Sequence, residues 1–328
     1  MKKSIRIFII CLLVTGCRNN TTHPVDFYYW KANVSIGEVE QNYFNSLKCT
    51  NLYIRFFDVD RQGSEITPIS KIQPFDSKVL NANYVPVIFI TNRTFSNISE
   101  PQIETLAERI IELVEKICKK NALPSPSEIQ IDCDWTETTR IAYFKFLELL
   151  EDFSRKQVSC TLRLHQVKFR EKTGIPPVSK GYLMCYATSD PKDESDRNSI
   201  LDIDLLKEYT ANINDYPVDF DVALPVFSWA IATNHLGKIR LINNVTSADL
   251  DSISFKQTGD HTFEITEDLF FQGIYLNKGF TLKLESISPG LLQEARQYLD
   301  KKIKKPYHIV YYHLDKPFLN QYSIKELR

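Results

Sequence analysis

Residues 128–137 read Glu-Ile-Gln-Ile-Asp-Cys-Asp-Trp-Thr-Glu, and apolar and polar side chains alternate along them. Successive side chains of a β-strand point to opposite faces. One face therefore carries Ile129, Ile131, Cys133 and Trp135, and the other carries Gln130, Asp132 and Asp134. The apolar face suits packing beneath helices. The polar face would place two carboxylates inside the fold, where an unpaired ionised group costs several kcal/mol. We therefore predict a covered strand whose acidic face is paired or functional.

Similar strand-like segments recur along the chain. We predict strands at 26–31, 52–58, 85–91, 128–135, 159–165, 181–187, 221–229 and 308–314. Between several of them lie segments with an apolar stripe at helical spacing, and these predict helices at 104–120, 138–155 and 289–304. Ser288 is the expected N-cap of the last helix, with Pro289 at its first position. The alternation indicates an α/β fold with a parallel sheet and crossover helices. Eight strands favour a closed (β/α)8 TIM-like barrel, with an open doubly wound sheet as the alternative.

The segment at 232–286 breaks this alternation. It has no strong helical period, and its short runs at 238–242, 262–266, 272–276 and 281–284 predict antiparallel strands joined by turns. We expect a small β-rich insertion after strand seven. In a barrel, the loops that follow the strands open on the catalytic face.

The N-terminus predicts secretion and anchoring. Lys2, Lys3 and Arg6 precede the short apolar run 7–14, which is the pattern of a signal peptide. The residues up to Cys17 resemble the bacterial lipoprotein signal, which implies removal of 1–16 and lipidation of Cys17. The expected mature chain is a tether at 17–24 followed by the barrel at 25–328, and the alternative is an ordinary signal peptide with a chance cysteine. The absence of aspartate at 18–20 favours the outer membrane of the cell envelope, by analogy with lipoprotein sorting.

Charge and cysteine content argue against several classes of function. Without Lys2, Lys3 and Arg6, 37 of the 40 basic residues remain against 41 acidic ones, a net charge of −4. Nucleic-acid-binding proteins usually show a clustered basic face, so no nucleic-acid partner is expected. Cysteines with paired spacing are absent, which supports neither a disulfide framework nor a zinc site. We expect no cofactor and no metal.

Polar side chains on two other predicted strands could pair with the carboxylates. They are Arg55 and Asp58 in or near 52–58, and Arg163 and His165 in 159–165. Arg55 and Arg163 are expected to neutralise Asp132 and Asp134 through charge-assisted hydrogen bonds. Such a network either only holds the barrel in register or also presents the carboxylates to a ligand.

Aromatic residues gather near the ends of six predicted strands. They are Trp30, Phe57, Trp135, Tyr186, Trp229 and Tyr312. Flat rings at one level suit the faces of sugar rings, although each ring taken singly is more often part of a core.

Two short segments resemble a known family of enzymes. Residues 129–136 are similar to the family-18 glycoside hydrolase signature Asp-x-x-Asp-x-Asp-x-Glu, with Asp132 and Asp134 at its second and third aspartates. Met184-Cys185-Tyr186 resembles the Met-x-Tyr on the sixth strand of that family. The likeness departs from the family at two positions, because Ile129 stands at the first aspartate and Thr136 at the catalytic glutamate, with Glu137 one residue later. The longer run 129–150, with 159–162 and 223–229, resembles a group of bacterial lipoproteins that have a glycosidase-like TIM barrel and no established activity.

The resemblance implies a membrane-anchored, carbohydrate-active barrel that is a candidate glycoside hydrolase for a cell-envelope or environmental glycan. In an active enzyme, Glu137 would be the general acid, Asp134 would orient the substrate, Asp132 would tune Asp134, and Tyr186 would support the substrate. The expected substrate-binding residues are Trp30, Arg55, Asp58, Trp135, Arg163, His165, Trp229 and Tyr312.

Two other functions compete with hydrolysis. The first is a catalytically inactive lipoprotein that binds a glycan or serves as a scaffold, which Thr136 at the acid position supports. The second is a metal-dependent hydrolase with Asp132, Asp134 and His165 as ligands, although their spacing matches no metal motif.

Overall fold

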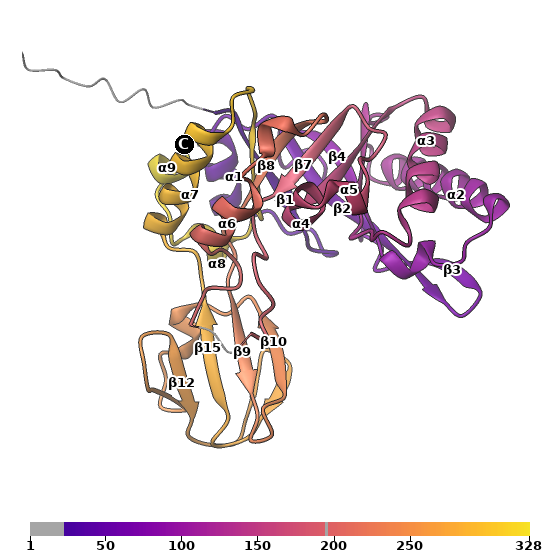
Figure 1. Ribbon diagram of the computed structural model, residues 1–328. Coiled ribbons are helices and arrows are strands. Elements are labelled where there is room, and N and C mark those ends of the chain that lie inside the picture. The colour runs from indigo at the N-terminus through magenta and orange to yellow at the C-terminus, as the bar shows by residue number, and fades with distance from the viewer. Residues whose placement is uncertain (1–22, 194–195) are drawn as a thin grey trace, which may run out of the picture.

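A computed structural model describes residues 23–193 and 196–328 (Figure 1). The predicted signal peptide and the lipidation of Cys17 lie outside these residues. No helix in the described ranges is long and apolar enough to cross a bilayer.

Eight parallel strands close into a barrel. They are β1 (Val25–Tyr29), β2 (Asn51–Gln62), β4 (Asn83–Ile90), β5 (Glu128–Asp132), β6 (Gln157–Arg163), β7 (Lys180–Met184), β8 (Asp219–Pro225) and β16 (Ile309–Tyr312). They follow the order β1-β16-β8-β7-β6-β5-β4-β2, and pairing of β1 with β2 closes the ring. The predicted TIM-like barrel is therefore confirmed, and the open-sheet alternative is wrong.

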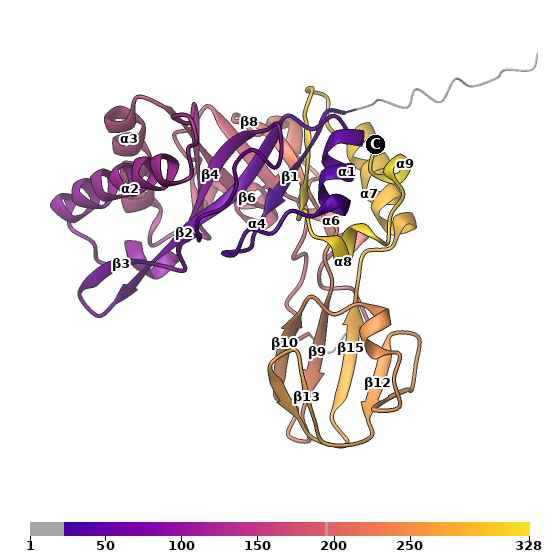
Figure 2. The ribbon, with the colours of Figure 1, turned by 180° about the vertical axis from the view of Figure 1, so that it is seen from behind.

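Helices connect and cover the strands (Figure 2). They are α1 (Glu38–Ser46), α2 (Glu100–Lys120), α3 (Arg140–Ser154), α4 (Leu164–Lys168), α5 (Arg170–Thr173), α6 (Ile203–Tyr209), α7 (Pro289–Lys302), α8 (Lys316–Leu319) and α9 (Ile324–Leu327), with 3-10 turns at Asn92–Phe95, Ile213–Asp215 and Ser247–Leu250. Capping groups mark two of the starts. The backbone N–H of Ser99 donates to Oε1 of Gln102 at the start of α2, at 3.0 Å. Ser288 Oγ accepts from the backbone N–H of Leu291, so the predicted N-cap of α7 is confirmed.

The two faces of β5 separate as their alternation predicts. Ile129, Ile131 and the following Cys133 are fully buried in the main core, beside Tyr143 of α3. On the other face, Asp132 accepts a hydrogen bond from Thr161 of the neighbouring strand. The strand ends at Asp132, earlier than the predicted end at 135.

The insertion after β8 forms a layer of its own. Its five-stranded antiparallel sheet consists of β9 (Trp229–Thr233), β10 (Ile239–Asn243), β11 (Phe255–Gln257), β12 (Thr262–Ile265) and β15 (Thr281–Glu285). A small hairpin joins β13 (Leu269–Phe271) to β14 (Ile274–Leu276). A separate apolar core holds this layer together, and both ribbon views show it projecting from the barrel (Figures 1 and 2). Strand β8 ends at Pro225, and at a strand end the missing N–H of proline costs little. Trp229 begins β9, so it belongs to the insertion rather than to the predicted strand seven.

A further hairpin extends the barrel sheet. Strand β2 continues past the ring and turns at Gly63 into β3 (Glu65–Ile69), which pairs with it antiparallel. The positive φ of Gly63 fits the tight turn. This hairpin was not predicted.

Candidate functional site

A pocket of about 580 Å³ opens where the barrel strands end and the insertion begins. It is lined by Trp30, Lys31, Arg55, Asp58, Phe89, Asp132, Arg163, Met184, Tyr186, Ala187, Phe227, Ser228, Trp229, Asn243, Asn244, Tyr312 and His313. We call it the mouth pocket. Carboxyl ends of barrel strands are where TIM barrels assemble their functional groups, because loops from all strands converge there.

Aromatic rings form a continuous wall of the mouth pocket. The ring of Tyr312 lies 5.5 Å, centroid to centroid, from each of Trp30, Tyr186 and Phe227. Phe227 in turn lies 5.4 Å from Trp229. The rings meet at tilted or edge-on angles, which is the favoured geometry for aromatic pairs. The wall joins the predicted aromatic residues Trp30, Tyr186, Trp229 and Tyr312 in one surface.

Asp132 is a buried acid that borders the pocket. Its side chain accepts a hydrogen bond from Thr161 Oγ1 at 2.7 Å, and the residue is 4% exposed. Burial raises the pKa of Asp132 to about 6, because a charged carboxylate loses its hydration there. Arg163 opposes this rise in the pKa, while the nearby Asp134 and Asp58 add to it. Asp132 can therefore exchange a proton close to neutral pH, as general acids and bases do.

Two arginines hold the other carboxylates by paired hydrogen bonds. Arg163 donates to Asp134 from Nε at 2.5 Å and from Nη2 at 3.1 Å. Arg55 donates to both carboxylate oxygens of Asp58, and its guanidinium lies 5.5 Å from the ring centroid of Trp30. Pairing of Arg163 with Asp134 is as predicted. Arg55 does not pair with Asp132 or Asp134, because Asp58 lies three residues further along its own strand.

Four predicted site residues lie outside the lining of the mouth pocket. Asp134 is directed to Arg163, and its side chain is 46% exposed. Glu137 is exposed in the loop between β5 and α3. Trp135 is fully buried, stacks on Tyr143 of α3 and donates its indole N–H to the carbonyl of Thr173. His165 is exposed on α4, since β6 ends at Arg163 and the chain turns helical there.

The position of the family-18 catalytic glutamate carries no acid in this pocket. Thr136 is exposed, and its backbone N–H donates to Thr139 Oγ1 at 3.0 Å. Because β5 ends at Asp132, no strand continues far enough to aim Glu137 inward. The structure thus brings four of the predicted charged residues to the pocket, namely Arg55, Asp58, Asp132 and Arg163.

Sequence reasoning missed several pocket residues. They are Lys31, Phe227, Asn243, Asn244 and His313. His313 lies near the end of the predicted eighth strand, and the two asparagines follow the predicted run 238–242, so their places at strand ends were the available signal.

Two buried polar atoms in the pocket have no protein partner among the described residues. They are the hydroxyl of Tyr186 and Nδ1 of His313. Burial lowers the pKa of His313 to about 3, and Lys31 adds to the lowering, so the ring is neutral at physiological pH. Buried polar groups are nearly always hydrogen-bonded. Both atoms are closed off from solvent in this structure, so a ligand reaches them only when neighbouring side chains move.

The insertion fixes the orientation of Trp229. Its indole N–H donates to Oε2 of Glu285 at 2.8 Å, and Glu285 is buried. The same carboxylate accepts from Ser199 and pairs with Lys283 at 3.0 Å. Glu285 therefore joins the loop after β7, the insertion and one ring of the aromatic wall.

The described residues contain no group of three His, Cys, Asp or Glu side chains placed to hold a metal ion. The proposed set of Asp132, Asp134 and His165 is separated in the structure, with Asp134 bound to Arg163 and His165 exposed on α4.

Comparison with solved structures identifies the fold. The spore cortex-lytic enzyme SleL of Bacillus cereus aligns with 93% of this chain and 73% of its own, at 14% identity and a TM-score of 0.57. A chitinase from Chromobacterium violaceum aligns with 93% of this chain and 99% of its own, at 11% identity and a TM-score of 0.56. The class V chitinase of Nicotiana tobaccum aligns with 93% of this chain and 97% of its own, at 10% identity and a TM-score of 0.52. No family model and no curated protein matches the sequence. The predicted distant likeness to family-18 glycosidases is confirmed, at the level of a shared TIM-barrel fold.

Proposed function

We propose that this protein is a membrane-anchored glycan-binding barrel whose mouth pocket holds an oligosaccharide. The observation that carries the proposal is a wall of five aromatic residues beside the polar side chains of Arg55, Asp58, Asp132 and Arg163; the aromatic residues are Trp30, Tyr186, Phe227, Trp229 and Tyr312. Ligand sites commonly combine an apolar surface with a few placed polar groups. Aromatic faces cover the apolar faces of sugar rings, and the polar atoms take up the hydroxyl or amide groups.

The position of Glu137 favours glycan binding over a hydrolysis in which Glu137 is the general acid. A general acid must lie within hydrogen-bond reach of the glycosidic oxygen. Glu137 is exposed outside the pocket lining, and Thr136 has no proton to give at a useful pKa. The arrangement therefore supports the inactive-binder hypothesis over the family-18 mechanism.

Hydrolysis by another acid is the second candidate, and the properties of Asp132 favour it. A carboxyl group with a pKa of about 6 carries a proton for part of the time at neutral pH. In this reaction the bond between the anomeric carbon and the glycosidic oxygen breaks and the oxygen takes the proton of Asp132. Water then adds to the anomeric carbon and loses a proton, which restores the protonated form of Asp132. Glycosidases keep one carboxyl protonated by the same means.

Titration calorimetry tests the proposal, with the release of reducing ends measured in parallel. The ligands are the tetrasaccharide of N-acetylglucosamine, a cellulose tetrasaccharide and soluble peptidoglycan fragments. We expect one of these glycans to bind, with no release of reducing ends. Tyr312→Ala should weaken binding, because Tyr312 contacts three other rings of the wall, while the matched control Glu137→Gln should bind like the wild type. Release of reducing ends that Asp132→Asn abolishes would establish the second candidate. Absence of binding to every glycan, or a loss with Glu137→Gln, would refute the pocket assignment.

Anchoring through Cys17 is a separate part of the proposal, supported by the lipoprotein-like signal. Metabolic labelling with palmitate should mark the wild type and not Cys17→Ser. Labelling of both proteins would refute Cys17 as the lipidation site. Fractionation of the labelled protein with outer membranes tests the expected location.

A further inference from the structure

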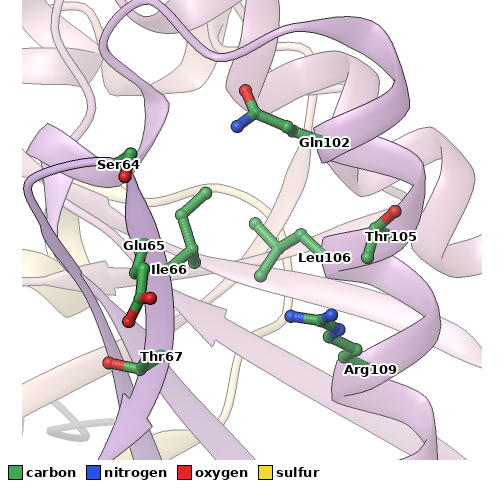
Figure 3. A pocket seen from close by; sticks show the side chains of 8 residues that line it. All are labelled: Ser64, Glu65, Ile66, Thr67, Gln102, Thr105, Leu106 and Arg109. Atoms are coloured by element: carbon green, nitrogen blue, oxygen red, sulfur yellow. The ribbon is translucent and has the colours of Figure 1, made fainter.

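A second pocket, of about 530 Å³, lies between β3 and α2 (Figure 3). On one side it is lined by the consecutive residues Ser64, Glu65, Ile66 and Thr67, and on the other by Gln102, Thr105, Leu106 and Arg109. The helix residues recur at intervals of three and four, so they share one face. Consecutive strand residues alternate between the two faces of a sheet, so a pocket lined by all of them borders the backbone of the strand as well as its Ile66 face. We call it the edge groove.

The edge of β3 is free for pairing. In the described residues β3 is the last strand of its sheet and pairs with β2 alone. Pro68 lies opposite Val59 in this pairing and has no N–H, so this pair is one that exchanges no hydrogen bonds. Hydrogen-bonded and non-bonded pairs alternate, which makes Ile66 with Arg61 another non-bonded pair. The N–H and C=O of Ile66 therefore point outward along the edge groove.

The groove also offers an apolar floor and one cation. Ile66 is half-buried and Leu106 is buried, and the side chain of Leu106 points from α2 toward β3 (Figure 3). The guanidinium of Arg109 points the same way and is exposed. Within residues 23–193 and 196–328, Arg109 forms no ion pair, because no carboxylate lies within 4.0 Å of it.

We propose that the edge groove binds an extended peptide segment of a partner protein. The segment adds to β3 as a short strand centred on Ile66, which supplies both a donor and an acceptor. One aliphatic side chain of the segment packs on Ile66 and Leu106, and a carboxylate of the segment meets Arg109. Pro68 limits pairing to the part of β3 that borders the groove. Helix α2 walls the far side, which leaves space for an isolated strand, whereas a second copy of this chain would bring β2 and α2 along with its own β3.

The test begins with a random linear heptapeptide library displayed on phage and selected on the whole protein. We expect enriched peptides to alternate aliphatic and polar residues and to contain an acid. The best peptide, made synthetically with a fluorophore, is then titrated by anisotropy. Ile66→Pro removes the outward N–H together with the isoleucine side chain of the floor and no hydrogen bond to β2, so it should weaken binding at least about tenfold while leaving the β2 pairing in place. Arg109→Ala should weaken it severalfold, and Lys119→Ala on the same helix is the matched control.

Pro68→Thr provides an independent check, because it adds an outward N–H and should tighten peptide binding. An unchanged thermal midpoint confirms that each variant is folded. Equal affinity for the wild type, Ile66→Pro and Pro68→Thr would overturn the proposal, as would a selection that enriches no peptide. A concentration-dependent dimer that Ile66→Pro dissociates in sedimentation would instead identify a second copy as the occupant and equally overturn it.

Discussion

Replacement of Asp132 by asparagine should stabilise the protein at neutral and alkaline pH but not in acid. The pKa of Asp132 is about 6 in the folded chain, against 3.8 for an ordinary aspartate. The folded state therefore binds more protons than the unfolded state between these values, and the free energy of unfolding falls as pH rises through them. A shift of about two units corresponds to about 3 kcal/mol, which is an order-of-magnitude figure for a buried group. The asparagine side chain carries no charge at any pH, and its amide oxygen can still accept from Thr161.

Urea unfolding checks this pH-dependent stabilisation. The wild type and Asp132→Asn are measured from pH 4 to pH 8. The quantity of interest is the difference between the two free energies of unfolding, because titrating groups that do not interact with Asp132 contribute equally to both proteins. We expect the variant to gain about 3 kcal/mol relative to the wild type between pH 4 and pH 8. A difference that stays constant with pH would show that Asp132 has an ordinary pKa. It would also remove the basis for proton transfer by this residue.

Three other outcomes follow from the contacts of the site. Arg163→Met should enlarge that pH-dependent difference and extend it to pH values above 6, because Arg163 lowers the pKa of Asp132; an unchanged pH range would contradict this. Glu285→Ala should cost about 1–3 kcal/mol and change the fluorescence of Trp229, since it leaves buried donors without an acceptor. Glu285→Gln should restore the fluorescence, and failure to do so would contradict a positioning role. Trp135→Phe should cost about 1–3 kcal/mol in urea unfolding with unchanged glycan affinity, whereas a loss of affinity would place Trp135 in the site.

The barrel was predictable because strand and helix periods are local properties of the chain. The eight predicted strands all occur, and the apolar face of 129–135 packs beneath α3 as its alternation indicates. The N-cap at Ser288 was predictable from the adjacent pair Ser288-Pro289 alone. The β2–β3 hairpin escaped prediction, because Gly63-Ser64 is a short turn signal within a polar stretch.

The site was less predictable, because it depends on where strands end and on which charges meet. Trp135 shares the apolar face of 129–135 with Ile129 and Ile131, so the alternation itself argued for the core and against a sugar platform. His165 lies outside the mouth pocket because helix α4 begins directly after Arg163. The residues Asn243 and Asn244 come from the insertion, and nothing local announces that they reach the mouth of the barrel.

The sequence by itself determined the alternating strands and helices, the β-rich insertion and the presence of acidic and aromatic side chains at the strand ends, because alternation and helical spacing act over a few neighbouring residues. Closure of the barrel depends on the pairing of β1 with β2, which only the tertiary structure shows. Only the tertiary structure decided which of these acids borders the pocket. Arg163 lies close enough to bind Asp134 and leaves Asp132 to Thr161, and Asp58 takes Arg55. Such choices depend on distances between strands far apart in the chain, and burial then determines which carboxyl keeps its proton.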